Sequence, residues 1–281
     1  MAEDQQELTI FFCIGAAKTG TTLLARVLDQ HPDIACIWES YALTPRAKAS
    51  IFNPASSSWQ KHGFAREKVE RWAAVWRAQP QALLRRILRK ATGRPHLVVS
   101  PFQRTMSEAL TDFARRCQAR VVGDKWPWYI GYLRPVLEAF PQARFVYNVR
   151  DPRGLWNSAQ RFKGRERGDE LLQRMLEQDR RVTPYLKRAN FYTVRYEDLV
   201  NEPAETCRQL FAFLGCDFAQ EYLSYHPEAD PYPQRWDWVP QASQAFDPWH
   251  TAKWKEQMTA DEIVQVSRRA RWFLDKYGYE D

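Results

Sequence analysis

The sequence predicts a three-layer α/β fold in which helices cover both faces of a central parallel sheet. Two observations predict it. Short apolar runs alternate with longer segments whose apolar residues recur at helical spacing, which is the pattern of β-α-β units. The first apolar run also ends in a glycine-rich turn that leads directly into a helical segment. No internal repeat or flexible linker divides the chain, so we expect residues 1–281 to form a single domain.

The strands of this sheet are expected where an apolar, β-branched or aromatic run is short and bounded by turn residues. The first such run ends at Gly15, and the segment ARFVYNV is the clearest of them. The expected strands are Leu8–Ile14, Ala119–Gly123, Ala143–Val149 and Phe191–Arg195.

The helices are expected where leucine, valine and aromatic residues recur at helical spacing. Pro80 should break one long helical segment in two. The expected helices are Thr21–Gln30, 64–91, 105–117, Ile130–Phe140, Pro152–Phe162, 169–188, 203–214 and 259–277. Residues 225–250 differ, because they are rich in proline and tryptophan; we expect an ordered loop over a functional site, with a packed surface excursion as the alternative.

The composition excludes several classes of protein. Hydrophobic residues make up 44% of the chain, so a wholly disordered protein is excluded. No apolar run reaches the roughly 20 residues of a membrane span, and the acidic residues before the first strand are unlike a secretion signal. We therefore expect a cytoplasmic protein. The five cysteines include no CxxC pair and the histidines have no ligand-like spacing, so neither disulfides nor a metal site is expected.

The formal net charge of +7 suits a partner that carries negative charge. No RNA-recognition or zinc-finger pattern is present, so we do not expect nucleic acid as the partner. A phosphorylated small molecule fits the charge better.

The turn after the first strand, GAAKTGTT (residues 15–22), predicts an anion site in a P-loop-type fold. A nucleoside-triphosphate loop has the form GxxxxGK[ST], with the lysine on the phosphates and the hydroxyl on magnesium. Here Gly15 and Gly20 keep that spacing, but Thr21 occupies the lysine position and Lys18 lies inside the loop. The loop therefore suits an anion held by Lys18, Thr21, Thr22 and backbone N–H groups without a metal.

A second anion site is predicted at the end of the clearest strand. Arg150 follows that strand directly, and ligands of open parallel sheets gather at the carboxyl ends of the strands. Ser158 lies eight residues further on, about two helical turns away and hence near the same helix face. The arginine and the hydroxyl together can bind a phosphate. Arg150 has an alternative structural partner in the neighbouring Asp151.

These two segments carry a family resemblance. They resemble the sulfotransferases that use 3′-phosphoadenosine 5′-phosphosulfate (PAPS) and release 3′,5′-adenosine bisphosphate (PAP). Further motifs are similar to the branch that contains tyrosylprotein sulfotransferases and their bacterial relatives. The matching segments are KTGTTLLARVLDQHPD (18–33), WES (38–40), GDKWP (123–127), RFVYNVRDPRGLWNSAQR (144–161), VRYEDLV (194–200) and AKWKEQMT (252–259).

The resemblance implies a role for individual residues. The 5′-phosphosulfate would be held by Lys18, Thr19, Gly20, Thr21 and Thr22. The 3′-phosphate would be held by Arg150 and Ser158, with Tyr196 and Lys253 also on the nucleotide. The chain departs from the relatives at Phe162, where they carry an arginine; Arg161 precedes it. The serine that relatives place before the C-terminal lysine has Ser243 as its candidate here, and His250 lies close to that lysine.

The resemblance also implies the chemistry. Glu39 matches the catalytic glutamate and would take the proton of the acceptor hydroxyl. Lys18 and Lys125 would neutralise charge on the leaving phosphate and the moving sulfuryl group. The alternative partner for Lys125 is the neighbouring Asp124. We expect residues 41–104 and 225–250 to shape the acceptor site.

The acceptor itself is not named by the sequence. It is a small molecule, a sugar or a phenol with a free hydroxyl, and the oligomeric state is open, a homodimer included. The lack of an anchor motif favours a bacterial cytoplasmic enzyme. Two other functions stay open from the residues alone: a metal-dependent P-loop nucleotide kinase, which the lysine position disfavours, and a noncatalytic nucleotide- or nucleic-acid-binding protein.

Overall fold

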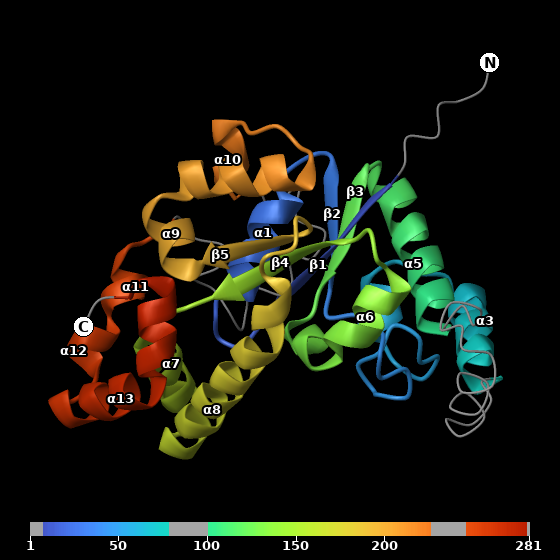
Figure 1. Ribbon diagram of the computed structural model, residues 1–281. Helices are drawn as coiled ribbons and strands as arrows, with labels where there is room; N and C mark the ends of the chain where they lie inside the picture. Colours follow the sequence, from blue (N-terminus) through green and yellow to red (C-terminus); the bar gives the residue numbers. More distant parts are fainter. Residues whose placement is uncertain (1–7, 79–100, 226–245, 280–281) are drawn as a thin grey trace.

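The protein is described here by a computed structural model over residues 8–78, 101–225 and 246–279. Its centre is a sheet of five strands in the order β2-β3-β1-β4-β5 (Figure 1). Every neighbouring pair of strands is parallel, as predicted. The strands are β1 (Thr9–Gly15), β2 (Ile34–Trp38), β3 (Val121–Lys125), β4 (Arg144–Val149) and β5 (Phe191–Arg195).

Helices cover both faces of this sheet, which confirms the predicted three layers. Figure 1 shows α1 and α10 along one face and α6 and α8 along the other. Among the described helices, none combines the length and the apolar character needed to cross a bilayer. The helices are α1 (Thr21–Asp29), α2 (Ser58–Lys61), α3 (Arg66–Arg77), α5 (Pro101–Cys117), α6 (Leu133–Ala139), α7 (Pro152–Lys163), α8 (Arg165–Val182), α9 (Tyr196–Asn201), α10 (Pro203–Leu214), α11 (Trp249–Ala252), α12 (Trp254–Gln257) and α13 (Ala260–Tyr277).

The edge strand β2 was not predicted from the sequence. Its residues IACIW are all buried, so no polar residue alternates with the apolar ones. Alanine and cysteine weaken the strand signal further, and the run is only five residues long. Burial on both faces is usual in a parallel sheet. In β2 this burial removes the alternation of apolar and polar residues that would reveal a strand in the sequence.

The predicted helix Ile130–Phe140 is shorter than expected. A 3₁₀ helix, Pro127–Tyr132, precedes α6, which begins only at Leu133. The prediction for 64–91 is matched by α3 up to Arg77. Its second half, with the break at Pro80, lies outside the described residues, as do Ser243 and most of the proline- and tryptophan-rich segment.

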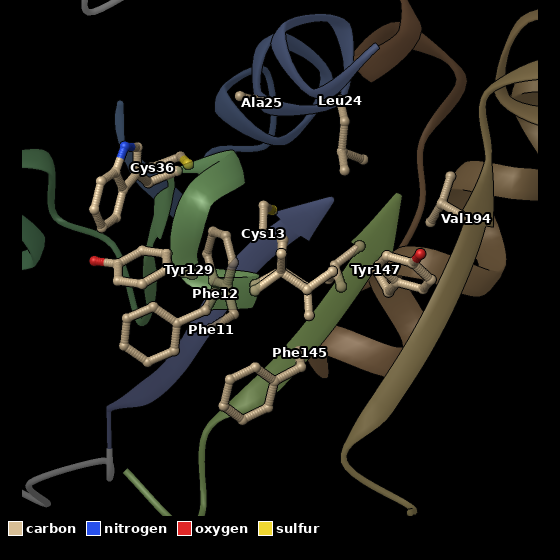
Figure 2. Packing of buried hydrophobic residues seen from close by; sticks show 14 of the residues in the cluster. Phe11, Phe12, Cys13, Leu24, Ala25, Cys36, Tyr129, Phe145, Tyr147 and Val194 are labelled. Atoms are coloured by element: carbon tan, nitrogen blue, oxygen red, sulfur yellow. The ribbon is translucent and has the colours of Figure 1, made fainter. Parts of the chain in front are cut away.

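The core fixes where the strands end. Phe11 and Phe12 of β1 have no exposed surface, and Phe12 stacks on Phe145 of β4 with ring centroids 5.7 Å apart. Figure 2 shows these rings beneath Leu24 and Ala25 of α1. Close packing of this kind leaves little freedom for a central strand to slide. The loops that leave the strands therefore start from fixed positions.

A buried carboxylate ties the C-terminal helix to the sheet. Asp179 of α8 has no exposed surface and accepts hydrogen bonds from the hydroxyls of Tyr147 at 2.9 Å and Tyr277 at 2.5 Å. The ammonium of Lys276 donates to the other carboxylate oxygen at 2.7 Å. One side chain thus joins β4, α8 and α13.

Replacing this carboxylate should destabilise the whole domain. Asp179→Ala leaves two hydroxyls and an ammonium without their acceptor, so we expect a loss of about 3–5 kcal/mol in the free energy of unfolding. The control Tyr277→Phe removes a single hydrogen bond and should cost about 1 kcal/mol. Urea denaturation measures both. Equal losses in the two variants would show that Asp179 does not act as the shared acceptor.

Candidate active site

The strands end at one edge of the sheet, and the residues singled out in the sequence follow these ends. Strand register places Gly15 at the end of β1 beside Asn148 of β4, and Trp38 at the end of β2 beside Lys125 of β3. Parallel strands gather their carboxyl-end loops in this way. Two groups of residues result, one between β1 and β4 and one between β2 and β3.

The glycine-rich loop is held in shape by the neighbouring strand. The side-chain amide of Asn148 donates to the carbonyl of Thr19 at 2.5 Å, and Nη1 of Arg150 donates to the carbonyl of Lys18 at 3.0 Å. The Thr19 hydroxyl donates to the carbonyl of Ala16 at 2.7 Å, so it stabilises the loop itself. Lys18 has a φ of 70°, a left-handed conformation that non-glycine residues rarely adopt. Sequence reasoning missed Asn148, although it is the polar residue inside the strand ARFVYNV.

The start of α1 presents backbone donors that the helix itself does not pair. Thr21 and Thr22 are its first two residues, and N–H groups in a first helical turn have no partner within the helix. Gly20 caps the helix with a φ of 86°. A Cβ at this position would lie 2.3 Å from the Tyr196 ring, so only glycine fits. The loop, the helix start and Tyr196 are thereby packed together.

Three cations from separate parts of the chain meet here: Lys18, Arg150 and Lys253. Burial lowers the pKa of Lys18, and the charge of Arg150 lowers it further. Burial also lowers the pKa of Lys253, followed by the charges of Arg150, Arg161 and Lys18. Like charges in a partly buried cluster repel each other unless an anion lies among them. The arrangement is that of an anion site.

Arg150 has backbone partners and no described carboxylate. Besides the loop carbonyl, it donates from Nη2 to the carbonyl of His250 at 3.2 Å. Its guanidinium lies 4.2 Å from the centre of the Tyr196 ring. Its Nε is buried and has no hydrogen-bond partner within residues 8–78, 101–225 and 246–279. A buried donor without an acceptor is costly, so the site fits a ligand oxygen at this position.

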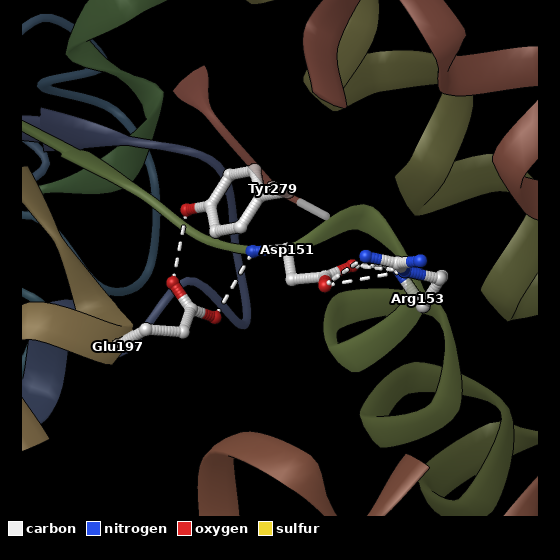
Figure 3. A network of polar contacts seen from close by, with 4 residues as sticks. All are labelled: Asp151, Arg153, Glu197 and Tyr279. Carbon is white, nitrogen blue, oxygen red and sulfur yellow. Dashed lines mark hydrogen bonds and ion pairs between the residues drawn. The ribbon is translucent and has the colours of Figure 1, made fainter. Parts of the chain in front are cut away.

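The alternative pairing of Arg150 with Asp151 does not occur. Asp151 pairs with Arg153 instead, with Nη2 at 2.8 Å from a carboxylate oxygen, and caps α7 by accepting the Arg153 N–H at 2.8 Å (Figure 3). Glu197 accepts the Asp151 N–H at 3.1 Å and the Tyr279 hydroxyl at 2.9 Å. Burial raises the pKa of Glu197. These contacts fix the backbone directly beside Arg150.

The departure from the family pattern at Phe162 has a structural counterpart. The ammonium of Lys18 lies 4.2 Å from the centre of the Phe162 ring, a cation–π contact. Ser158 lies four residues earlier on α7, and residues at that spacing share one helix face. The face of α7 that carries Ser158 is therefore turned toward the loop. Arg161 is exposed, yet its charge still acts on Lys253.

The second group consists of Glu39 and Lys125. Nζ of Lys125 lies 2.9 Å from Oε1 of Glu39; the lysine side chain is 1% exposed and the glutamate side chain 32%. The Glu39 N–H also donates to the Lys125 carbonyl at 2.7 Å. Glu39 and Tyr41 have φ values of 57° and 51°. Strained backbone of this kind is found preferentially at functional sites.

The alternative pairing of Lys125 with Asp124 is also wrong. Asp124 is fully buried and accepts hydrogen bonds from the hydroxyls of Ser40 and Tyr129. Burial raises the pKa of Asp124 to about 6. Asp124 thus anchors the chain next to Glu39 and leaves Lys125 to the glutamate.

His31 has a structural role. Its Nδ1 accepts the Asp33 N–H at 3.0 Å, and its ring packs 4.6 Å from that of Tyr222. Cys216 lies near enough to His31 and Asp33 to suggest a metal cluster. However, Asp33 accepts from Nε of Arg120 at 2.7 Å, and burial raises the pKa of the Cys216 thiol to about 11. His31 and Asp33 therefore already have hydrogen-bond partners in the fold, and the Cys216 thiol stays protonated at neutral pH.

Comparison with known proteins places the chain in a family. A family model described as "Sulfotransferase family" matches residues 11–220. The chain belongs to the sulfotransferase family. It is 22% identical over 286 residues to a putative protein-tyrosine sulfotransferase of Caenorhabditis briggsae, which covers 96% of this chain and 89% of that protein. It is 25% identical to an omega-hydroxy-beta-dihydromenaquinone-9 sulfotransferase of Mycobacterium tuberculosis, over 56% of this chain and 40% of that protein.

Solved structures of sulfotransferases share the fold. The sulfotransferase domain of the Synechococcus PCC 7002 olefin synthase superposes with a TM-score of 0.62 at 18% identity, covering 100% of this chain and 98% of that one. The sulfotransferase domain of the curacin biosynthetic pathway gives a TM-score of 0.59 at 19% identity, covering 94% and 98%. These likenesses support the α/β architecture of this sulfotransferase.

Gly20→Ala should remove anion binding at the loop. The new Cβ collides with the Tyr196 ring and must also adopt a positive φ, so the loop has to move away from its present shape. Gly278→Ala is the matched control, because Gly278 has a φ of 65°, in the same left-handed region as Gly20, but no atom within 4 Å of a Cβ. We expect PAP to raise the melting temperature of the control and not that of Gly20→Ala. Equal stabilisation of both variants would contradict the packing argument.

Proposed function

We propose that this sulfotransferase moves the sulfuryl group from PAPS to a hydroxyl of an acceptor, with Glu39 as the general base. The observation that carries the proposal is the cluster of Lys18, Arg150 and Lys253 beside the paired Glu39 and Lys125. The three cations suit a nucleotide that carries negative charge at two places. The Glu39–Lys125 pair suits removal of a proton next to that nucleotide.

The donor site follows from the two ends of the cluster. Lys18 and the first N–H groups of α1 would hold the 5′-phosphosulfate, since a helix start and a lysine both favour an anion. Arg150 and Ser158 would hold the 3′-phosphate, with the buried Nε of Arg150 as the donor that lacks an acceptor. Tyr196 would contact the nucleotide from beneath Arg150. Lys253 would close the site from the C-terminal part of the chain.

The chemical step balances with the residues at hand. The acceptor oxygen attacks sulfur as its proton passes to the Glu39 carboxylate, and an oxygen–sulfur bond forms. The bond between sulfur and the oxygen of the 5′-phosphate breaks, and PAP leaves with the electron pair. Positioning and charge stabilisation supply most of the rate in such transfers. Lys18 and Lys125 would neutralise charge on the phosphate and on the sulfuryl group.

PAP should bind without magnesium, and the protein should take up protons when PAP binds. The lowered pKa values mean that Lys18 and Lys253 lose their protons at a lower pH than an ordinary lysine, and a bound phosphate raises the pKa values again. Affinity should therefore fall as the pH rises. Calorimetry in EDTA, in two buffers of different ionisation enthalpy, measures the uptake. Lys253→Arg is the control, because arginine stays charged and should reduce the uptake.

Other results would favour the alternatives. Stabilisation by ATP only with magnesium would favour a kinase. Stabilisation by neither nucleotide, with salt-sensitive binding to DNA or RNA, would favour a nucleic-acid-binding protein. Loss of PAP binding on addition of EDTA would contradict the metal-free donor site.

Glu39→Gln should retain PAP affinity and lose turnover by about 10²–10⁴-fold, the usual contribution of a positioned base. The amide keeps the size of the side chain but cannot accept the proton. The measurement is single-turnover sulfuryl transfer at saturating PAPS, with calorimetry of PAP as the control for folding and binding. Turnover close to that of the parent protein would remove Glu39 from the mechanism.

A further inference from the structure

A cavity of about 690 Å³ is lined by Tyr41, two residues after Glu39, and by Trp126, the residue after Lys125. One wall is aromatic and comes from the loop after β2 and the 3₁₀ helix after β3. The other wall is charged and comes from α8. The lining includes Tyr41, Trp126, Trp128, Tyr132, Arg174 and Arg181. A second cavity, of about 710 Å³, shares Thr44 and Ala47 with the first and extends toward α3.

The aromatic wall is continuous with the reacting pair. Tyr41 is two residues beyond Glu39, and the charge of Glu39 adds to burial in raising the pKa of the Tyr41 hydroxyl. Trp126 directly follows Lys125, and its ring lies 5.2 Å from that of Tyr41. On its other side Trp126 stacks on Tyr132, with centroids 5.9 Å apart and planes 13° apart. Flat apolar walls of this kind favour a planar ring.

The charged wall is a row of arginines on α8. Arg167, Arg174 and Arg181 are seven residues apart, which places them near one face of the helix at intervals of about 10 Å. The row begins at the donor site, because the charge of Arg167 contributes to lowering the pKa of Lys18. Arg174 lies 5.2 Å from the centre of the Trp128 ring and so joins the two walls. Arg174 and Arg181 line the cavity, whereas Arg167 lies outside its lining.

The three arginines differ in their partners. Arg167 and Arg174 both pair with Glu170. Arg181 has no ion pair with a carboxylate in the described part of the chain, although it lines the cavity. Glu177, the acidic residue of the lining, accepts a hydrogen bond from the Gln173 amide at 2.8 Å. Arg181 is therefore the cation of the cavity with free capacity for an anion.

We propose that this cavity binds the acceptor, and that the acceptor is a planar ring compound that carries the reacting hydroxyl and, away from it, an anionic group. This inference rests on the proposed function. The ring would lie against Tyr132 and Trp128, the hydroxyl would face Glu39, and the anion would lie at Arg181, with Arg174 beside it. A carboxylate, phosphate or sulfate satisfies the same chemistry.

A matched pair of probes tests the charge preference. The probes are 7-hydroxycoumarin-4-acetate and its neutral amide, 7-hydroxycoumarin-4-acetamide, which differ in charge but hardly in shape. Binding to the PAP-loaded protein is measured by fluorescence titration, and turnover with PAPS by the loss of coumarin fluorescence. We expect kcat/KM to favour the acid about tenfold, the size of one charge-assisted hydrogen bond.

Variants on α8 locate the preference. Arg181→Gln should bring the acid-to-amide ratio of kcat/KM close to one. Arg180→Gln is the matched control on the neighbouring residue. The Arg180 guanidinium lies 5.1 Å from the centre of the Trp272 ring, and this variant should keep the parent ratio. Trp128→Leu removes an aromatic wall and should weaken both probes together.

The outcomes distinguish a failure of the proposed function from a failure of the acceptor assignment. If the protein does not bind PAP, the proposed function is wrong. A protein that binds PAP but neither probe, or that treats acid and amide alike, overturns the acceptor assignment and leaves the donor site intact. An equal loss of preference in Arg180→Gln and Arg181→Gln would also overturn it, because the effect would then be general to the charge of α8.

Discussion

The constraint on which the site depends is mutual repulsion among cations that the fold holds together. Lys18, Arg150 and Lys253 are brought to one sheet edge from three distant parts of the sequence. Burial and like charge lower the pKa values of both lysines. The contacts that hold Arg150 are two carbonyl groups and the Tyr196 ring, which offset the charge only in part. In the free protein the repulsion among these cations is therefore only partly compensated, and an anionic ligand can compensate the rest.

Holding such a cluster requires a rigid support, and the support lies one residue away. The Asp151 carboxylate is occupied by Arg153, so it cannot neutralise Arg150. The Asp151 N–H is held by Glu197, which is itself held by Tyr279 near the end of the described chain. This separation of tasks keeps the binding arginine available while its backbone stays fixed. Asp151 and Glu197 thus lie near the cationic cluster, but their carboxylates bind Arg153, the Asp151 N–H and Tyr279 instead of Arg150.

Sequence patterns predicted that Lys18 and Arg150 lie at the same sheet edge, because both belong to short motifs at strand ends. Lys18 and Arg150 both follow strands whose apolar runs are plain in the sequence. Other features were invisible for physical reasons. Strand β2 has no alternation because both its faces are buried. Asn148, Phe162 and Glu197 act on residues far away in the chain, so their roles depend on strand pairing and helix packing that no local pattern encodes.

The same reasoning explains why the acceptor half is hard to derive from sequence. The donor contacts come from strand ends, which the core fixes. The cavity walls come from a loop, a 3₁₀ helix and a distant face of α8, which lie between residues 41 and 181 of the chain. What joins the halves is the backbone at Glu39 and Tyr41. Their positive φ values turn the chain sharply after β2, so that Glu39 meets Lys125 while Tyr41 joins the aromatic wall. Asp124 accepts hydrogen bonds from the Ser40 N–H and hydroxyl, which hold that turn, and with it the Glu39–Lys125 pair, in place from the core side.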